Sequence, residues 1–176
     1  EQKLILKACT QALGKDHPQT IAARNNLANA YRLAGNLPKA KSIFEQVEAD
    51  STRVLGTDHP YTLQSRNNLA GVYRLAGGYT EAINLFEQVI ADRSRLLGQN
   101  HPDTLTTRNN LAGAHQASGR VARAVNLYSQ ILNDCLRELH PHHPLTGVVR
   151  ENLEAAWREL EQQEEDSANE EREQED

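Results

Sequence analysis

The chain has no methionine, little aromatic character and no long run of apolar residues. A helix that spans a bilayer needs roughly 18 or more consecutive apolar residues, so no membrane span is predicted, and no signal-peptide pattern is present. Because methionine is absent, residue 1 is not expected to be a translation start, and we expect the sequence to be a fragment of a longer protein. Aromatic residues make up 5% of the chain, and alanine and leucine dominate the apolar set, which favours closely packed helices.

An excess of positive charge is missing as well. The net charge is -5, of which residues 161–176 contribute -8 through nine acids and one arginine. The remaining chain carries +3, which is too small and too scattered for a nucleic-acid-binding surface. We expect the acidic segment to be a disordered tail or a fraying helical extension, because it is almost purely polar.

What the sequence does contain is a repeat. Arg-Asn-Asn-Leu-Ala occurs at 24–28, 66–70 and 108–112, a spacing of 42 residues, and a degenerate copy begins at Arg150. A fixed period of this length predicts a solenoid of stacked helical units. Such an array builds a binding surface, so we expect no catalytic residues, no cofactor and no enzyme activity.

The period divides the chain into units of two helices each. Apolar residues recur with helical spacing after Pro18, Pro60 and Pro102 and again after Leu37, Tyr79 and Val121. The predicted division is a truncated second helix at 1–13, full units at 14–55, 56–97 and 98–139, a capping helix at 140–160 and the acidic tail at 161–176. A truncated array exposes a stacking face, here Leu4, Ile5 and Leu6, and this face predicts a homo-oligomer as the alternative function.

The units are joined by the pattern Leu-Gly-x-Asp/Asn-His-Pro-x-Thr. Glycine past a helix end supplies a left-handed conformation, and Asp16, Asp58 and Asn100 are predicted to be N-caps before the proline of the first turn. His17, His59, His101 and His143 occur once per period, too far apart to share an ion. His140, His142 and His143 are clustered without a nearby cysteine or acid, so no metal site is predicted.

These residues resemble the tetratricopeptide repeat (TPR) family. The spacing Leu27-Ala28-x-x-Tyr31-x-x-x-Gly35, followed by Ala40 and Phe44, matches the TPR pattern. The 42-residue period, the junction and the paired asparagines resemble the kinesin-light-chain type. The resemblance implies an all-α, right-handed superhelical solenoid of antiparallel helix hairpins, in which the first helices line a concave peptide-binding groove. The residues assigned structural roles are Leu27, Tyr31, Leu69, Tyr73, Phe44, Phe86, Gly35 and Gly77.

Amide and guanidinium groups on the first helices are the candidate groove residues. An asparagine amide can both accept from and donate to a peptide backbone. The predicted groove set is Asn25, Asn29, Arg32, Asn67, Arg74, Asn109 and Gln116. Alternatively, one asparagine of each pair ties its helix to a neighbouring repeat; the candidates for this role are Asn26, Asn68 and Asn110. The arginines favour an acidic or carboxylate-bearing partner, with a solvated helix face as the alternative.

Glycine and a second set of arginines interrupt these helices. Gly71 and Gly113 each cost about 1 kcal/mol relative to alanine. Either two first helices cross there, which is the preferred interpretation, or a ligand backbone approaches. Arg24, Arg66 and Arg108 border the core and are predicted to pair with acids such as Asp50 and Asp92.

The chain contains two cysteines. Cys9 and Cys135 are 126 residues apart, which is three periods, so a solenoid keeps them beyond disulfide reach. Two free thiols favour a cytoplasmic location. The predicted function is a protein–protein interaction scaffold that binds a peptide in the groove. Self-assembly through the N-terminal helix is the alternative, and the acidic tail occupying the groove in cis is a third interpretation.

Overall fold

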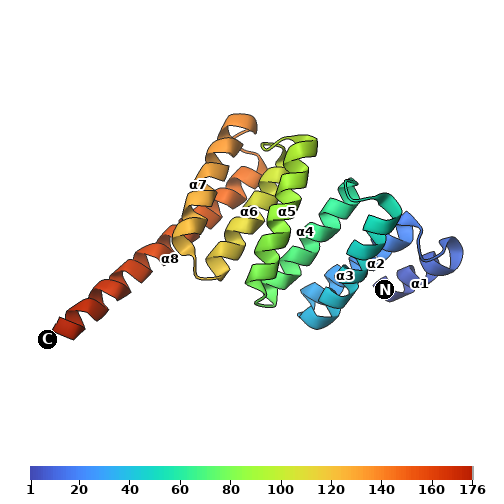
Figure 1. Cartoon of the computed structure of the whole chain (residues 1–176), viewed down its shortest axis with the longest axis horizontal. Helices are drawn as coiled ribbons and strands as arrows, with labels where there is room; N and C mark the ends of the chain where they lie inside the picture. Colours follow the sequence, from blue (N-terminus) through green and yellow to red (C-terminus); the bar gives the residue numbers. More distant parts are fainter. Residues whose placement is uncertain (176) are drawn as a thin grey trace. The chain divides into compact units, whose positions relative to one another are not determined.

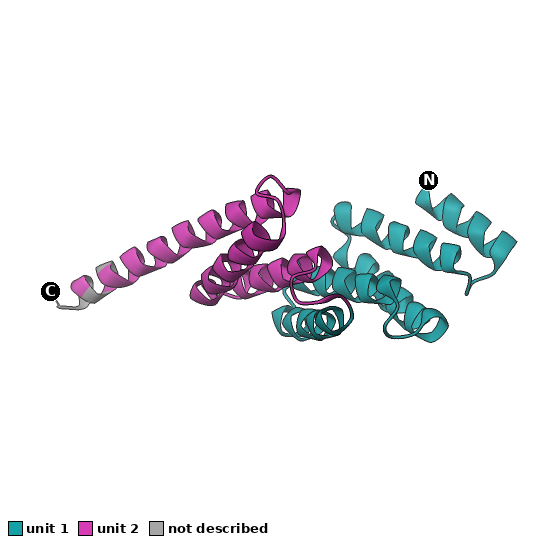
Figure 2. Ribbon diagram, turned by 90° about the horizontal axis from the view of Figure 1, so that it is seen from above, with its two compact units in different colours: residues 1–96 teal, residues 97–176 magenta. Residues whose placement is uncertain are grey.

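The computed structural model describes residues 1–175, and every regular element in that range is an α-helix. The helices fall into two compact units, residues 1–96 and 97–176, which are coloured separately in Figure 2. Figure 1 labels the helices in chain order. They are α1 (Gln2–Leu13), α2 (Pro18–Leu33), α3 (Leu37–Leu55), α4 (Pro60–Leu75), α5 (Tyr79–Leu97), α6 (Pro102–Ala117), α7 (Val121–Glu138) and α8 (Pro144–Glu175).

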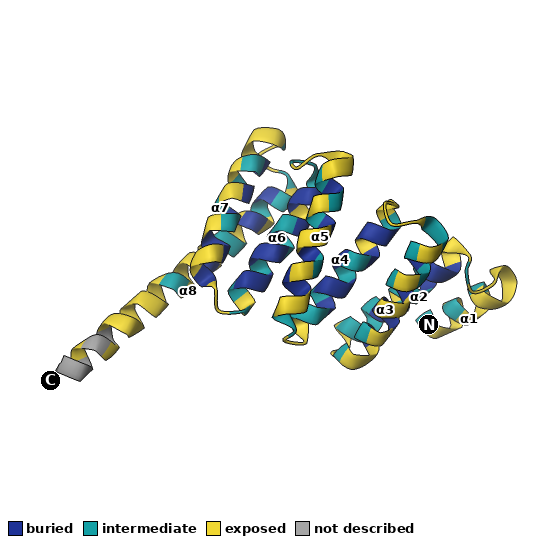
Figure 3. Ribbon diagram, in the orientation of Figure 1, coloured by how far each residue is buried: buried dark blue, intermediate teal, exposed yellow. Residues whose placement is uncertain are grey.

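Within unit 1, consecutive helices pack against each other, and α2, α3, α4 and α5 each bury one stripe (Figure 3). Phe44 of α3 is fully buried and belongs to one cluster with Leu69 and Val72 of α4, so it joins one repeat to the next. Leu27 and Tyr31 are half-buried against this cluster, and Phe86 of α5 is fully buried. Ala76 follows Val72 and Tyr73 at helical spacing, but it is exposed because it is the C-cap of α4.

Unit 2 has its own core, built mainly by α7. Buried residues recur along α7 with helical spacing, and α8 contributes Val149 and Ala156. The α7 residues are Val121, Ala124, Val125, Tyr128, Ile131 and Cys135. Glu154, which replaces the alanine of the other repeats, is exposed, so no carboxylate is buried there.

The helix junctions correct one prediction. The N-caps of α2, α4 and α6 are His17, His59 and His101, each one residue after the predicted Asp or Asn. In each case imidazole Nδ1 accepts from the backbone N–H two residues later, at 3.1–3.2 Å. Gly35 and Gly77, just past the ends of α2 and α4, have φ of 76° and 82°, as a left-handed stop requires.

The acids that were predicted to be caps belong to ion pairs instead. Asp16 binds Arg53, which also binds Asp50, and Asp50 pairs with Arg24. The second repeat has the same arrangement, with Asp58, Arg66, Asp92 and Arg95. In the third repeat Asp134 binds Arg108 and Arg137, each at 2.8 Å. The predicted pairing of the helix arginines with Asp50 and Asp92 is therefore confirmed.

The two ends of the chain differ from the predicted division in detail. α1 starts at Gln2 and has no buried residue. α8 continues through residue 160 and the acidic segment as far as Glu175, which agrees with the helical extension given as one of the two alternatives for this segment. Acidic residue Asp176 lies outside the described part of the chain.

Candidate functional site

The paired asparagines bring first helices together. Asn68 of α4 donates from Nδ2 to Oδ1 of Asn25 in α2, at 3.1 Å. In unit 2, Asn152 of α8 donates in the same way to Asn109 of α6, at 3.0 Å. The second asparagine of one repeat therefore binds the first asparagine of the preceding repeat, as the structural alternative for Asn68 predicts.

These bonds bear on the predicted groove residues. Asn25 is half-buried, and Asn67 and Asn109 are buried, with exposed fractions of 7% and 9%. Amides in such positions stabilise the stacking of repeats, because a buried amide without a partner is costly. A ligand would have to reach them from a surface that other side chains form.

The other predicted groove residues lie at the edge of that surface. Arg32 donates from Nε to Oδ1 of Asn29 at 3.3 Å, and both side chains are half-buried, as is Arg74. In unit 2, Gln116 accepts from the Tyr128 hydroxyl at 3.5 Å and donates to Glu159 at 2.7 Å. The structure thus brings Asn29 and Arg32 together and engages Gln116 with other side chains of its own unit.

Two residues of this surface were not predicted. Leu33 is 77% exposed and Leu75 is 45% exposed, each directly after an arginine. The signal in the sequence is the repeated Arg-Leu at the end of α2 and of α4. We call the exposed faces of these two helices the α2–α4 surface; its residues are Asn26, Asn29, Arg32 and Leu33 of α2 with Gln64, Asn68, Gly71, Arg74 and Leu75 of α4.

Gly71 lies in the middle of the α2–α4 surface. A Cβ atom added to it would meet nothing within 4 Å, so the predicted helix crossing is wrong at this position. At Gly113, by contrast, the added atom would lie 3.2 Å from the Tyr128 hydroxyl. The fold therefore explains the glycine in unit 2 and leaves the one in α4 unexplained.

A cavity of about 480 Å³ opens on the other side of α4. Arg66, Leu69 and Tyr73 of α4 form its floor, and residues of α3 and α5 form its walls. Burial raises the pKa of Tyr73, and so do its hydrogen bond to Glu45 and the charges of Glu45 and Glu81. The wall residues are Glu48, Glu81, Asn84, Leu85 and Gln88.

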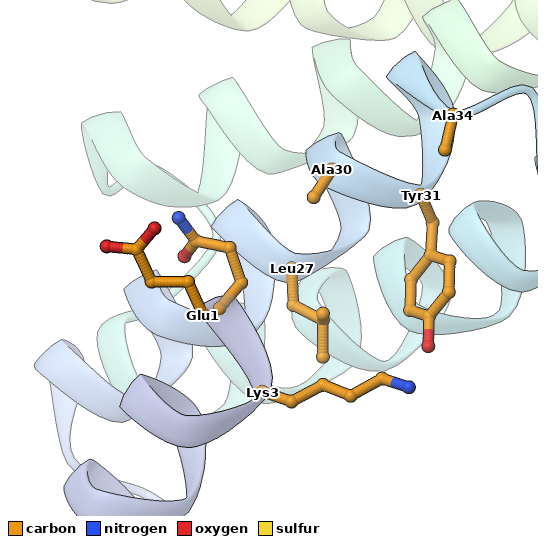
Figure 4. A pocket seen from close by; sticks show the side chains of 7 residues that line it. Glu1, Lys3, Leu27, Ala30, Tyr31 and Ala34 are labelled. Atoms are coloured by element: carbon orange, nitrogen blue, oxygen red, sulfur yellow. The ribbon is translucent and has the colours of Figure 1, made fainter.

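A smaller cavity, of about 330 Å³, lies between α1 and α2 (Figure 4). Leu27, Ala30 and Tyr31 form its apolar side, and Lys3 places its ammonium 5.7 Å from the centre of the Tyr31 ring. Its polar side consists of Glu1 and of Gln2 and Lys3, the first residues of α1.

Residues 1–175 were compared with the patterns of a metal site and of a membrane span. In this range no three His, Cys, Asp or Glu side chains gather as a metal site would require. None of the described helices combines the length and the apolar character of a bilayer span. Cys9 and Cys135 are both free thiols, and burial raises the pKa of Cys135.

Comparison with known proteins assigns the fold. Two tetratricopeptide repeat family models match the chain, one at residues 62–103 and 104–145 and the other at 2–52. No curated protein matches the chain.

Solved structures agree with the family models. The crystal structure of a candidate kinesin light chain of nearly identical TPR-like repeats from Podosopora anserina has a TM-score of 0.74 and 32% identity, over 93% of this chain and 78% of that one. A single-substitution variant of the same protein has a TM-score of 0.76 and 31% identity, over 93% and 77%. BtubC (BKLC) from P. vanneervenii, at 20% identity, has the same fold, with a TM-score of 0.76 over 89% of this chain and 64% of that one.

The predicted all-α repeat solenoid is confirmed, and its fold is that of a protein–protein interaction scaffold. The family matches together with relatives that are more than 30% identical over most of both chains identify it. The chain belongs to the tetratricopeptide repeat family, with repeats of the kinesin-light-chain type.

Proposed function

We propose that the chain binds an extended, acidic segment of a partner protein on the α2–α4 surface. The observation that carries this proposal is Gly71. A glycine inside a helix costs about 1 kcal/mol relative to alanine, and no neighbouring atom within 4 Å requires it. A position that is unfavourable for the fold and open to solvent suits the close approach of a ligand backbone.

The side chains around Gly71 define the chemistry of the ligand. Arg32 and Arg74 place two cations on the surface, and guanidinium groups bind carboxylates in a bidentate manner. Leu33 and Leu75 add exposed apolar contacts at the same helix ends. A segment that combines acidic with apolar side chains satisfies both features. Gln64 donates to Asn68 at 3.0 Å and Asn68 donates to Asn25, so each amide has a second N–H that can bind the backbone of the segment.

A pair of probe peptides tests this proposal. In the first, leucine alternates with aspartate between serine ends, and in the second lysine replaces every aspartate. We expect the aspartate peptide to bind more tightly by fluorescence anisotropy, and Arg32→Ala with Arg74→Ala to weaken it by about tenfold or more.

Controls in the same titration separate a site from net charge. Arg120→Ala with Arg123→Ala removes the same charge from exposed positions of unit 2 and should leave the affinity unchanged. An equal loss of affinity for the aspartate peptide in both double variants would refute the proposal. The two free thiols support a cytoplasmic setting for this module.

A second candidate function is self-assembly through α1. Ile5 is 42% exposed, whereas Val47, Val89 and Ile131, which hold the same place in the repeat, are fully buried. An exposed apolar face of this kind can bind another copy of the chain. We expect Leu4→Lys with Ile5→Lys to abolish concentration-dependent association in sedimentation experiments; a chain that is monomeric at high concentration excludes this candidate.

A further inference from the structure

The cavity between α3, α4 and α5 lies on the side of α4 opposite to the α2–α4 surface. Its floor residues, Arg66, Leu69 and Tyr73, follow one another at helical spacing, and so do Gln64, Asn68 and Gly71 on the opposite face. The two sites are therefore separate, and neither depends on the other.

Several polar groups of the cavity retain hydrogen-bonding capacity. Glu81, Asn84 and Gln88 are exposed, and no described side chain forms a hydrogen bond with them. Oε1 of Glu48 accepts hydrogen bonds from Arg66 and Thr52, at 2.9 and 3.1 Å. Its other carboxylate oxygen, Oε2, accepts no hydrogen bond from a described side chain. The cavity thus presents two carboxylates and two amides that are available to a ligand.

The repeat itself shows that these acids are not structural requirements. The places of Glu48 and Glu81 in the preceding repeat hold Leu6 and Lys39, and those in the following repeat hold Ile90 and Arg123. Glu48 belongs to the unit at 14–55 and Glu81 to the unit at 56–97, and the junction between these two units is the one of the three compared that has an acid at both positions. Glu48 pairs with Arg66 and Glu81 lies in the first turn of α5, but the leucine, isoleucine, lysine and arginine at these places in the other units show that the repeat can form without two acids there.

The cavity floor adds an aromatic and apolar component. Lys41 already places its ammonium 4.6 Å from the centre of the Tyr73 ring, so this ring lies in surroundings that suit a cation. Leu69 and Leu85 offer apolar contact to the aliphatic stem of a long side chain. Arg66, the one cation of the lining, is engaged by Glu48 and by Asp92.

We propose that this cavity binds a lysine or arginine side chain of an extended partner segment. Glu48 and Glu81 receive the charged head, Leu69, Leu85 and Tyr73 contact its stem, and Asn84 and Gln88 bind the adjoining backbone. The module then has two recognition surfaces of opposite preference, an acidic cavity and an arginine-bearing face, on the two sides of one helix.

The lysine-containing probe peptide tests this second site. We expect it to shift the amide NMR signals of Leu69, Tyr73 and Leu85 and to leave those of Gln64, Gly71 and Leu75 unchanged. We expect Glu81→Arg, the residue of the following repeat, to weaken its binding by about tenfold or more. Glu87→Arg is the matched control, because it makes the same charge change at an exposed position of the same helix outside the cavity.

Each other outcome overturns the inference. Equal weakening by the two variants would mean attraction by net charge only, and shifts confined to Gln64, Gly71 and Leu75 would place the peptide on the α2–α4 surface. Absence of binding at low salt would remove the site. The aspartate peptide is measured in parallel, so the failure of one surface is distinguishable from the failure of the other.

Discussion

Asn68 donates a hydrogen bond across 3.1 Å to the side-chain oxygen of Asn25, one repeat earlier in the chain. Asn25 is the first asparagine of its pair, whereas Asn68 is the second asparagine of the corresponding pair in the next repeat. The bond joins α2 to α4 next to the proposed peptide surface, so the same pair stabilises the stacking of repeats and supports the site.

Replacement of Asn68 by alanine measures how much this hydrogen bond contributes to stability. The change removes the donor and leaves the half-buried oxygen of Asn25 without it, so we expect a loss of about 1–2 kcal/mol in the free energy of unfolding. Asn26→Ala is the control, because Asn26 holds the same place in the first repeat but is exposed. Chemical denaturation of both variants provides the comparison, and equal losses would contradict the assignment.

The histidine N-cap of α4 makes a second prediction. His59→Ala removes the Nδ1 acceptor of the Tyr61 backbone N–H, and we expect a loss of about 0.5–2 kcal/mol of stability. His59→Asn restores a cap oxygen and should recover most of it. Asp58→Ala should cost less, because Asp58 and its partner Arg95 are exposed and water screens their attraction. A larger loss for Asp58→Ala than for His59→Ala would reverse the assignment of the cap.

Tyr61 predicts a pH dependence at high pH. Burial raises its pKa to about 12, and its hydroxyl donates to the carbonyl oxygen of Ile21 at 3.4 Å. In an unfolded chain tyrosine ionises near pH 10, so between about pH 10 and 12 only the unfolded state releases this proton. The contribution of Tyr61 is therefore complete below about pH 10 and is lost as the pH rises toward 12.

Denaturation of the wild type and of Tyr61→Phe at about pH 8 and pH 11 isolates this effect from other titrating groups. We expect the wild type to lose more stability than the variant over that interval. A loss of the same size in both proteins would show that Tyr61 ionises as it does in the unfolded chain.

Gly71→Ala should change stability and binding in opposite directions. Alanine removes the helix penalty of glycine without a clash, so we expect a gain of up to about 1 kcal/mol in the free energy of unfolding. If a ligand backbone approaches this position, the added methyl group should weaken binding of the aspartate peptide. Gly113→Ala, which crowds the Tyr128 hydroxyl, should show no such gain in stability. A more stable variant with unchanged affinity would remove Gly71 from the site.

The helices were predictable because their signals are local. Pro18, Pro60 and Pro102 mark first turns, Gly35 and Gly77 mark ends, and the period repeats each signal. The choice between Asp58 and His59 as the cap was not predictable, because both offer an acceptor and the selection depends on Arg95, which is 37 residues away in sequence.

The surface was predicted less completely for a related reason. Asn67 and Asn68 are identical in type, and only the geometry of packed helices shows that Asn67 is buried while Asn68 reaches the preceding repeat. Leu33 and Leu75 are apolar residues in a helical pattern that normally indicates burial, so their exposure became visible only in the structure.

The ion pairs of Asp16, Arg24, Asp50 and Arg53 close within the first repeat. A gene segment that encodes one such repeat can therefore be duplicated or deleted, and every charged residue of this network keeps its partner. The asparagine bond has the opposite property, because each copy requires a neighbour that carries the same pair. This four-residue network therefore places no constraint on growth of the array by recombination, whereas the amides, like the Glu48–Arg66 pair, need a matching neighbour.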